Sequence, residues 1–262
     1  MRLIAMSNHS SLKHKEQALE IYQKTISSLL LRIQTVAPEK SNFFVNVDQN
    51  QETKNLIILA GSQKGLCGNF NAALFQFFDL ERSALDFSTF DLITIGKIAY
   101  DFAKDKKIGP IIAHYDDFTT NTLLSISRKT TEKIASAKNL YKKVLVCSNI
   151  QKSFFLQKPI MQTLIPLEPE EFEKNSGTAT KEEYIWEQSP QELLHILHQY
   201  SIETKLHYIL FKSLLAEQAA RFISMDNSTR NAKSLQEKTK LDYNKLRQAK
   251  ITKELTELIG SF

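Results

Sequence analysis

The residues best placed to do chemistry form a glycine cluster, G-S-Q-K-G-L-C-G, at residues 61–68. The cluster follows an apolar run and precedes a predicted helix, which is where phosphate-binding loops sit. It does not match the P-loop pattern, because Lys64 precedes a glycine and no serine or threonine follows; nor does it match G-x-G-x-x-G. We favour a tight turn that packs against a sheet. The predicted turn comprises Gly65, Leu66, Cys67 and Gly68, with Cys67 as a small buried apolar residue.

Other reactive side chains are scattered. His195 and His198 lie three residues apart on one face of a predicted helix, but no carboxylate accompanies them to make a metal site. Cys67 and Cys147 alone cannot form a structural zinc site, and we expect them to be free thiols in a reducing compartment. No pairing of a nucleophile with a base can be recognised. The sequence therefore predicts no catalytic residue, no metal and no cofactor.

The chain carries a formal net charge of +5, and its basic residues cluster late in the sequence. A clustered basic face can bind nucleic acid. A solvated or protein-facing helix surface is the commoner meaning, and we favour it. No run approaches the ~20 apolar residues that a membrane-spanning helix needs. Six basic residues stand against Glu237 and Asp242 in this cluster: Lys238, Lys240, Lys245, Arg247, Lys250 and Lys253.

The elements that must position these residues include one very long helix. Residues 191–259 contain neither glycine nor proline, so the pattern predicts a helix of roughly 100 Å. Ser189 is a suitable N-cap and Pro190 a suitable first residue. An apolar seam begins near residue 202 and continues more sparsely through Leu235, Leu246, Leu255 and Leu258. A polar stretch at 224–234 interrupts it.

Earlier in the chain, residues 11–36 predict an amphipathic helix with apolar positions three and four apart. Short apolar runs then alternate with helical spacing, which predicts an α/β layer with a largely parallel sheet. Strands are expected at 55–60, 90–95, 108–114, 143–147 and 154–164. Helices are expected at 70–80, from the end of the second strand through residue 104, and at 121–140.

We therefore predict a Rossmann-like α/β domain inserted between two long terminal helices that form a projecting antiparallel coiled coil. The predicted divisions are residues 1–40 for the first helix, 54–188 for the α/β domain and 189–262 for the second helix.

Two stretches resemble the gamma subunits of F-type ATP synthases. Residues 56–75, LIILAGSQKGLCGNFNAALF, resemble the family pattern S-x-R-G-L-C-G-x-x-N-x-x-L-F. Residues 213–260 resemble the C-terminal signature E-x-x-A-R-x-x-A-M followed by L-x-x-x-Y-N-K-x-R-Q-A-x-I-T-x-E-L. Weaker motifs at 148–167 and 183–194 occur in the same order, so the resemblance covers nearly the whole chain.

The resemblance implies a rotor shaft that couples ion flow to ATP synthesis and makes no bonds itself. Its partners would be three alpha and three beta subunits, the epsilon subunit and the ring of c subunits. It would need no cofactor and bind no nucleic acid. The chain would be a peripheral membrane protein, held through the c ring to the cytoplasmic face of a bacterial inner membrane.

The motifs also assign residues to contacts. Arg247, Gln248, Thr252 and Glu254 match positions that touch the beta subunits. The mid-shaft contact would be made by Arg221, Met225, Asp226 and Arg230. The side that faces the c ring and epsilon would include Tyr184, Trp186 and Glu187.

Three departures from the family pattern stand out. The usual first segment of the N-terminal helix is absent, and we favour a misassigned start codon over a natural truncation. Lys64 and Asn69 replace the usual arginine and glycine, and lysine cannot make a bidentate contact. Asp226 and Arg230 exchange the usual signs while keeping an i,i+4 spacing that still permits an intrahelical ion pair. A stator contact at 226 would then need a basic partner residue.

Two other classes of protein would also fit parts of this sequence. A nucleotide-binding α/β protein with a coiled-coil arm would bind nucleotide as an isolated chain and lose binding when Gly65 is changed. A nucleic-acid-binding coiled coil would bind with an affinity that falls steeply with salt.

Overall fold

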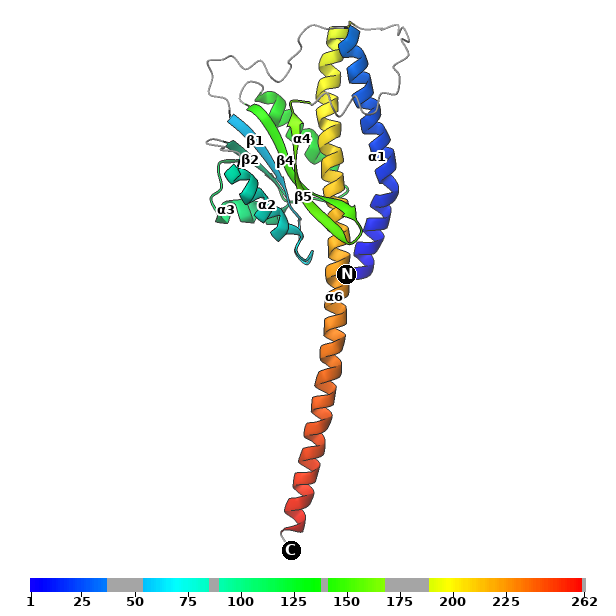
Figure 1. The fold of residues 1–262 in the computed structure, drawn as a ribbon, viewed down its shortest axis with the longest axis vertical. Coiled ribbons are helices and arrows are strands. Elements are labelled where there is room, and N and C mark those ends of the chain that lie inside the picture. Colours follow the sequence, from blue (N-terminus) through cyan, green and yellow to red (C-terminus); the bar gives the residue numbers. More distant parts are fainter. Residues whose placement is uncertain (37–53, 85–89, 138–140, 168–188, 261–262) are drawn as a thin grey trace.

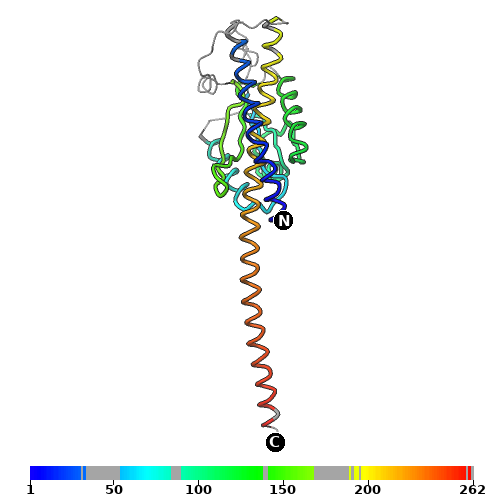
Figure 2. Tube along the Cα trace, turned by 90° about the vertical axis from the view of Figure 1, so that its right-hand side faces the viewer, coloured from blue at the N-terminus to red at the C-terminus, as the bar shows by residue number. Residues whose placement is uncertain are grey.

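Two long helices and one α/β unit make up the molecule (Figure 1). A computed structural model describes residues 1–36, 54–84, 90–137, 141–167 and 189–260 of the chain. Helices α1 (Arg2–Val36) and α6 (Pro190–Ile259) run side by side in opposite directions, and α6 continues far beyond the N-terminus of α1 (Figures 1 and 2). The domain divisions proposed above remain predictions.

The sheet has five strands in the order β3-β2-β1-β4-β5. Strands β1, β2, β3 and β4 are parallel, whereas β5 pairs with β4 in the antiparallel direction. The prediction of a largely parallel sheet is confirmed, and the β4–β5 hairpin is its one exception among the described strands. The strands are β1 (Lys54–Ala60), β2 (Phe90–Ile95), β3 (Ile111–Tyr115), β4 (Tyr141–Ser153) and β5 (Leu156–Ile165).

Helices cover both faces of the sheet. Helices α2 (Phe70–Ala84) and α3 (Lys97–Asp105) lie on one face, and α4 (Leu123–Ser136) and α6 lie on the other, with α1 packed outside α6. Strand β1 is buried on both sides because its residues alternate between the two cores. Leu56 and Ile58 face the core of α4 and α6, while Ile57 and Leu59 face that of α2 and α3.

The upper half of α6 is therefore a core element of the domain. Its buried seam contains Ile202, Leu206, Ile209, Leu210 and Leu214, as the apolar spacing predicts. The paired part of the two terminal helices lies against the sheet. In the described structure, the part that projects is α6 alone, which corrects the expectation of a projecting two-helix coil.

Helix α6 begins where the sequence predicts. The Ser189 side chain accepts a hydrogen bond from the backbone N–H of Glu192 at 3.3 Å, and Pro190 follows as the first helical residue. Helix α1, by contrast, begins at Arg2 rather than at residue 11.

We expect Ser189→Ala to lower the free energy of unfolding by about 1 kcal/mol, because the Glu192 amide loses its acceptor. Urea denaturation measures the loss. Ser189→Asp, which keeps an acceptor oxygen, should remain close to wild type. Equal losses in the two variants would show that the cap hydrogen bond is not the cause.

Candidate functional site on the shaft

The first candidate site is the free shaft, which we define as residues 227–259 of α6. Nearly every side chain described along it is exposed. This segment spans roughly 50 Å at 1.5 Å per residue. The predicted continuation of the seam is not buried: Leu235, Leu246 and Leu255 are 66%, 72% and 55% exposed. Exposed apolar residues in such number are typical of a surface that another molecule covers.

Basic residues share the free shaft with these apolar ones. All six basic residues of the predicted cluster are exposed. Two weak i,i+4 ion pairs lie near the tip, Lys250–Glu254 at 3.8 Å and Lys253–Glu257 at 3.7 Å. The shaft therefore presents positive charge that is only partly balanced within the chain.

The four residues that the motif assigns to beta-subunit contact all lie on the free shaft and are exposed. Arg247 and Glu254 are seven residues apart and share one side of the helix, and Gln248 and Thr252 share the adjacent side. The Thr252 hydroxyl donates to the backbone carbonyl of Gln248 at 2.9 Å, so this side chain is held close to the helix. Their role as contacts remains a prediction.

Just before the free shaft begins, Asp226 lies beside two arginines, one from each terminal helix. Arg230 Nη2 lies 2.8 Å from one carboxylate oxygen, so the ion pair expected from the exchanged signs is present. Arg2 of α1 donates to the other oxygen at 2.5 Å. The hydrogen bond from Arg2, together with the charge of Arg230, holds the pKa of Asp226 below its usual value. A partner contact at Asp226 would compete with both arginines.

One turn further into the domain, Arg221 is engaged within the chain. Its Nη2 atom donates to Glu217 Oε1 at 2.5 Å and to the backbone carbonyl of Lys64 at 3.2 Å. Glu217 is only 2% exposed, and burial raises its pKa to about 7 although Arg221 opposes the shift. Met225 is half-buried and lines a cavity beside the first turns of α1. Of the four mid-shaft residues, only Arg230 has a largely exposed side chain.

The glycine cluster forms the loop between β1 and α2, and it packs against α6. Leu66 and Gly68 both have positive φ, 66° and 59°, and a Cβ on Gly68 would lie 3.5 Å from the Ser224 side chain. Cys67 is buried against Ala216 and Ala220 of α6. The prediction of Cys67 as a small buried residue is confirmed, but it packs mainly against α6 rather than against the sheet. Gly65 has open space around it.

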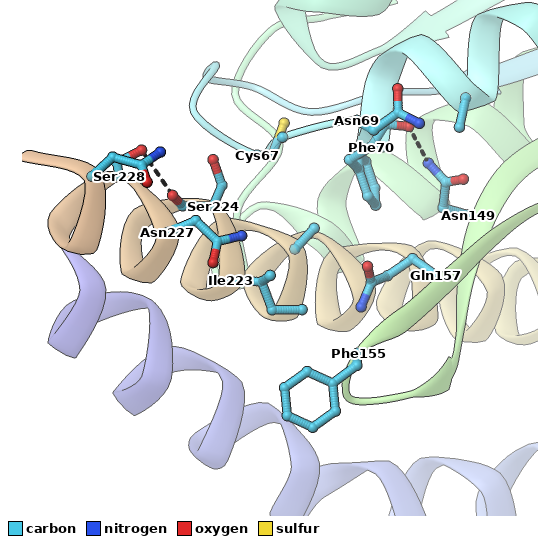
Figure 3. A pocket seen from close by; sticks show the side chains of 14 residues that line it. Cys67, Asn69, Phe70, Asn149, Phe155, Gln157, Ile223, Ser224, Asn227 and Ser228 are labelled. Carbon is cyan, nitrogen blue, oxygen red and sulfur yellow. Dashed lines mark hydrogen bonds between the residues drawn. The ribbon is translucent and has the colours of Figure 1, made fainter. Parts of the chain in front are cut away.

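A cavity of about 400 Å³ lies beside this loop, between α2, the β4–β5 hairpin and α6 (Figure 3). The position is the switch point between β1 and β4, where α/β sheets commonly bind ligands. Asn149 donates to the backbone carbonyl of Phe70 at 3.0 Å across it. The described residues that line the cavity include no lysine or arginine, so it offers no charged group for a phosphate.

Sequence reasoning missed Glu217 and Asn149. The pairing of Glu217 with Arg221 could have been predicted, since the two residues lie four apart on one helix, but the burial of Glu217 could not. The predicted residues Tyr184, Trp186 and Glu187 lie outside the described residues. Within the described ranges, no helix is both long enough and apolar enough to cross a bilayer.

Helix α6 is buried in the domain at one end and exposed along the free shaft, where basic and apolar side chains lie together. This arrangement is typical of a shaft-like subunit of a larger assembly. The comparisons with known proteins give the family. A family model described as ATP synthase matches residues 1–262. The ATP synthase gamma chain of Pelotomaculum thermopropionicum is 30% identical over 91% of this chain and 82% of its own length. That of Prosthecochloris aestuarii is 32% identical over 78% and 71%.

Solved structures share the fold. The rotor of the Euglena gracilis mitochondrial ATP synthase matches with a TM-score of 0.58 at 12% identity, over 95% of this chain and 98% of that one. The central stalk and c ring of the Tetrahymena thermophila enzyme contain a chain that matches with a TM-score of 0.54 at 16% identity, over 86% and 99%. The chain belongs to the ATP synthase gamma-chain family, the non-catalytic central-stalk subunits of the F-type enzyme.

Proposed function

We propose that this chain is the rotor shaft that couples ion-driven rotation to ATP synthesis or hydrolysis at three beta subunits. The observation that carries the proposal is the free shaft, which exposes apolar and basic residues together over roughly 50 Å. A ring of alpha and beta subunits that encloses it would cover both kinds of residue. The rigid helix would then present different sides to the three beta subunits and hold them in different conformations.

The contacts of a turning shaft must be weak individually. Arg247, Gln248, Thr252 and Glu254 are the residues that we assign to the beta subunits. Exposed ion pairs contribute ~0–1 kcal/mol each, so such contacts can form and break as the shaft turns. The net positive charge of the cluster supplies long-range attraction to acidic loops without fixing one partner.

At the other end, we assign the α/β domain to the epsilon subunit and the c ring, with Tyr184, Trp186 and Glu187 on that side. The membrane association of the chain is then indirect, through the c ring on the cytoplasmic face of a bacterial inner membrane. Two of the matching solved structures support a contact with a c ring: one chain belongs to a complex of F1 with a c ring and the other to a complex of the central stalk with a c ring.

The direct test is co-assembly. The chain is expressed with its cognate alpha and beta subunits, and the purified complex is weighed by native mass spectrometry. We expect one copy of this chain with three alpha and three beta subunits. An alpha–beta hexamer that forms but never contains this chain would contradict the rotor function.

A second prediction concerns the charge of the shaft. Changing Lys240, Lys245 and Arg247 to glutamine is expected to slow association with the alpha–beta hexamer about tenfold at low salt, because electrostatic steering is lost. Stopped-flow mixing of the purified components measures the rate. The charge-matched control changes three exposed lysines of the α/β domain, Lys142, Lys143 and Lys152. Equal slowing in both variants would show that net charge, and not the shaft, governs association.

A further inference from the structure

The carboxyl group of Glu217 is buried where α6 meets the glycine loop, which we define as residues 61–68. Its Oε1 atom accepts the hydrogen bond from Arg221 described above, whereas Oε2 is buried and has no hydrogen-bond partner among the described residues. A carboxylate in this position has lost most of its hydration, and the interaction with one guanidinium offsets only part of that loss. Such a group favours its neutral form.

The same guanidinium holds the loop closed. Arg221 Nη2 donates to the Lys64 carbonyl as well as to Glu217, so one side chain links the loop to the buried carboxyl. Cys67 and Phe70 pack on Ala216 and Ala220 beside it. The loop is therefore part of the cover over Glu217, and lifting it would let water reach Oε2.

Few other ionisable groups face this carboxyl. Arg221 is on the same helix, and the loop contributes the Cys67 thiol, whose pKa is raised mainly by burial and further by Glu217. The Lys64 side chain is exposed. A cavity of about 290 Å³ lies beside Glu217, and the residues that line it from outside α6 and the glycine loop have no ionisable side chain. They are Met1, with its main-chain amino group, Ile4, Ala5, Asn8 and Leu12 of α1, and Phe118, Thr119 and Thr120.

We propose that the Glu217–Arg221 pair and residues 62–67 form a pH-sensitive joint. The joint connects the α/β domain to helix α6 shortly before the free shaft begins. The joint is tightest when Glu217 is protonated, and the loop opens more often once the buried carboxyl becomes charged. Opening hydrates the carboxylate, so deprotonation favours the open state.

The direction and size of the effect follow from proton linkage. The pKa of Glu217 is about 7 with the loop closed, raised by burial from the ordinary value of 4.5 that a hydrated carboxyl regains when the loop opens. A group with a raised pKa stabilises the closed form at low pH, and this stabilisation is lost as the pH rises through about 7. Between pH 6 and pH 8 the equilibrium constant for opening should rise about tenfold.

The consequence is a rotor whose rigidity at one point depends on the proton concentration around it. The opening of residues 62–67 is a property of the isolated subunit, so its measurement is independent of the co-assembly test.

The test is amide hydrogen exchange of the full chain at pH 6, 7 and 8, with rates corrected for the intrinsic pH dependence of exchange. The reporting amides are those of Ser62, bonded to Asn71 Oδ1, and Phe70, bonded to the Cys67 carbonyl. The amide of Leu92, bonded to the Pro110 carbonyl, serves as a reference in the same domain. We expect protection of Ser62 and Phe70 to fall about tenfold from pH 6 to pH 8, with Leu92 unchanged.

Two variants make the result specific. Glu217→Gln keeps an oxygen for Arg221 but cannot ionise, so its loop should show the same protection at all three pH values. Glu132→Gln removes another i,i+4 arginine–glutamate pair, the exposed one with Arg128, and should behave as wild type. Loop protection that is independent of pH in the wild type would overturn the proposal. A pH dependence of loop protection that persists in Glu217→Gln would also overturn it, and so would a pH-dependent change of protection confined to α1. If Glu217→Gln fails to fold, the wild-type series still decides.

Discussion

Gly96→Ala is expected to lower the free energy of unfolding by about 3 kcal/mol. Gly96 follows β2 and precedes α3, with φ 87° and ψ 137°, a conformation open in practice only to glycine. A Cβ atom there would lie 2.6 Å from the Gly61 carbonyl oxygen and 2.8 Å from that of Ser62. Both neighbours are backbone atoms at the end of the central strand, so relief of the clash must move β1 or the glycine loop.

Urea denaturation followed by circular dichroism measures this loss. Gly65→Ala is the matched control, because Gly65 lacks a positive φ and has no atom within 4 Å of the added methyl group. We expect it to stay within about 0.5 kcal/mol of wild type. Similar losses for the two variants would mean that backbone conformation at Gly96 is not the cause.

Phe211→Ala is expected to cost 3–5 kcal/mol, about the range for removing a fully buried aromatic ring. Phe211 is 2% exposed and lies in the core that α6 shares with β1, β4 and α4. The neighbouring side chains belong to strands and helices that cannot collapse far into the space, so the cavity term adds to the lost transfer free energy. The substitution would directly weaken the packing of α6 against the sheet.

The same denaturation experiment tests this prediction, with Phe155→Ala as the control. Phe155 is 78% exposed at the tip of the β4–β5 hairpin, so its removal should change stability by about 0.5 kcal/mol or less. A small effect at Phe211 would show that α6 is not anchored through this core.

Hydrophobic patterning predicted the sheet well. Four of the five strands were expected within a few residues of their observed bounds, since buried β-branched runs such as 55–60 have few alternative structures. The exception is β4, which was expected at 143–147 and spans Tyr141–Ser153. The start of α1 was missed for a physical reason. The buried positions in its first turns are Ala5, His9 and Leu12, a small, a polar and only one large apolar residue, while Leu3 and Ile4 are exposed. No apolar stripe marks these turns.

The candidate site was predicted unevenly. Motif and helical spacing placed the residues of the free shaft, because position along one unbroken helix follows from counting. The burial of Glu217 could not be predicted in the same way. It depends on a loop more than 150 residues earlier in the chain, whose Lys64 carbonyl meets Arg221. Sequence reasoning likewise gave Arg221 and Asp226 an external role. It predicted the Asp226–Arg230 ion pair, but not the contacts of Asp226 with Arg2 or of Arg221 with Lys64.

Helix α6 is at once a core element and a lever arm. No glycine or proline interrupts it between the seam at Leu214 and the tip at Ile259, a distance of roughly 70 Å at 1.5 Å per residue. A tilt of about 5° at the seam would therefore carry the tip sideways by roughly 6 Å. Packing faults inside the domain are thus magnified at the far end, and the accuracy with which the tip is aimed is set by side chains that never approach it.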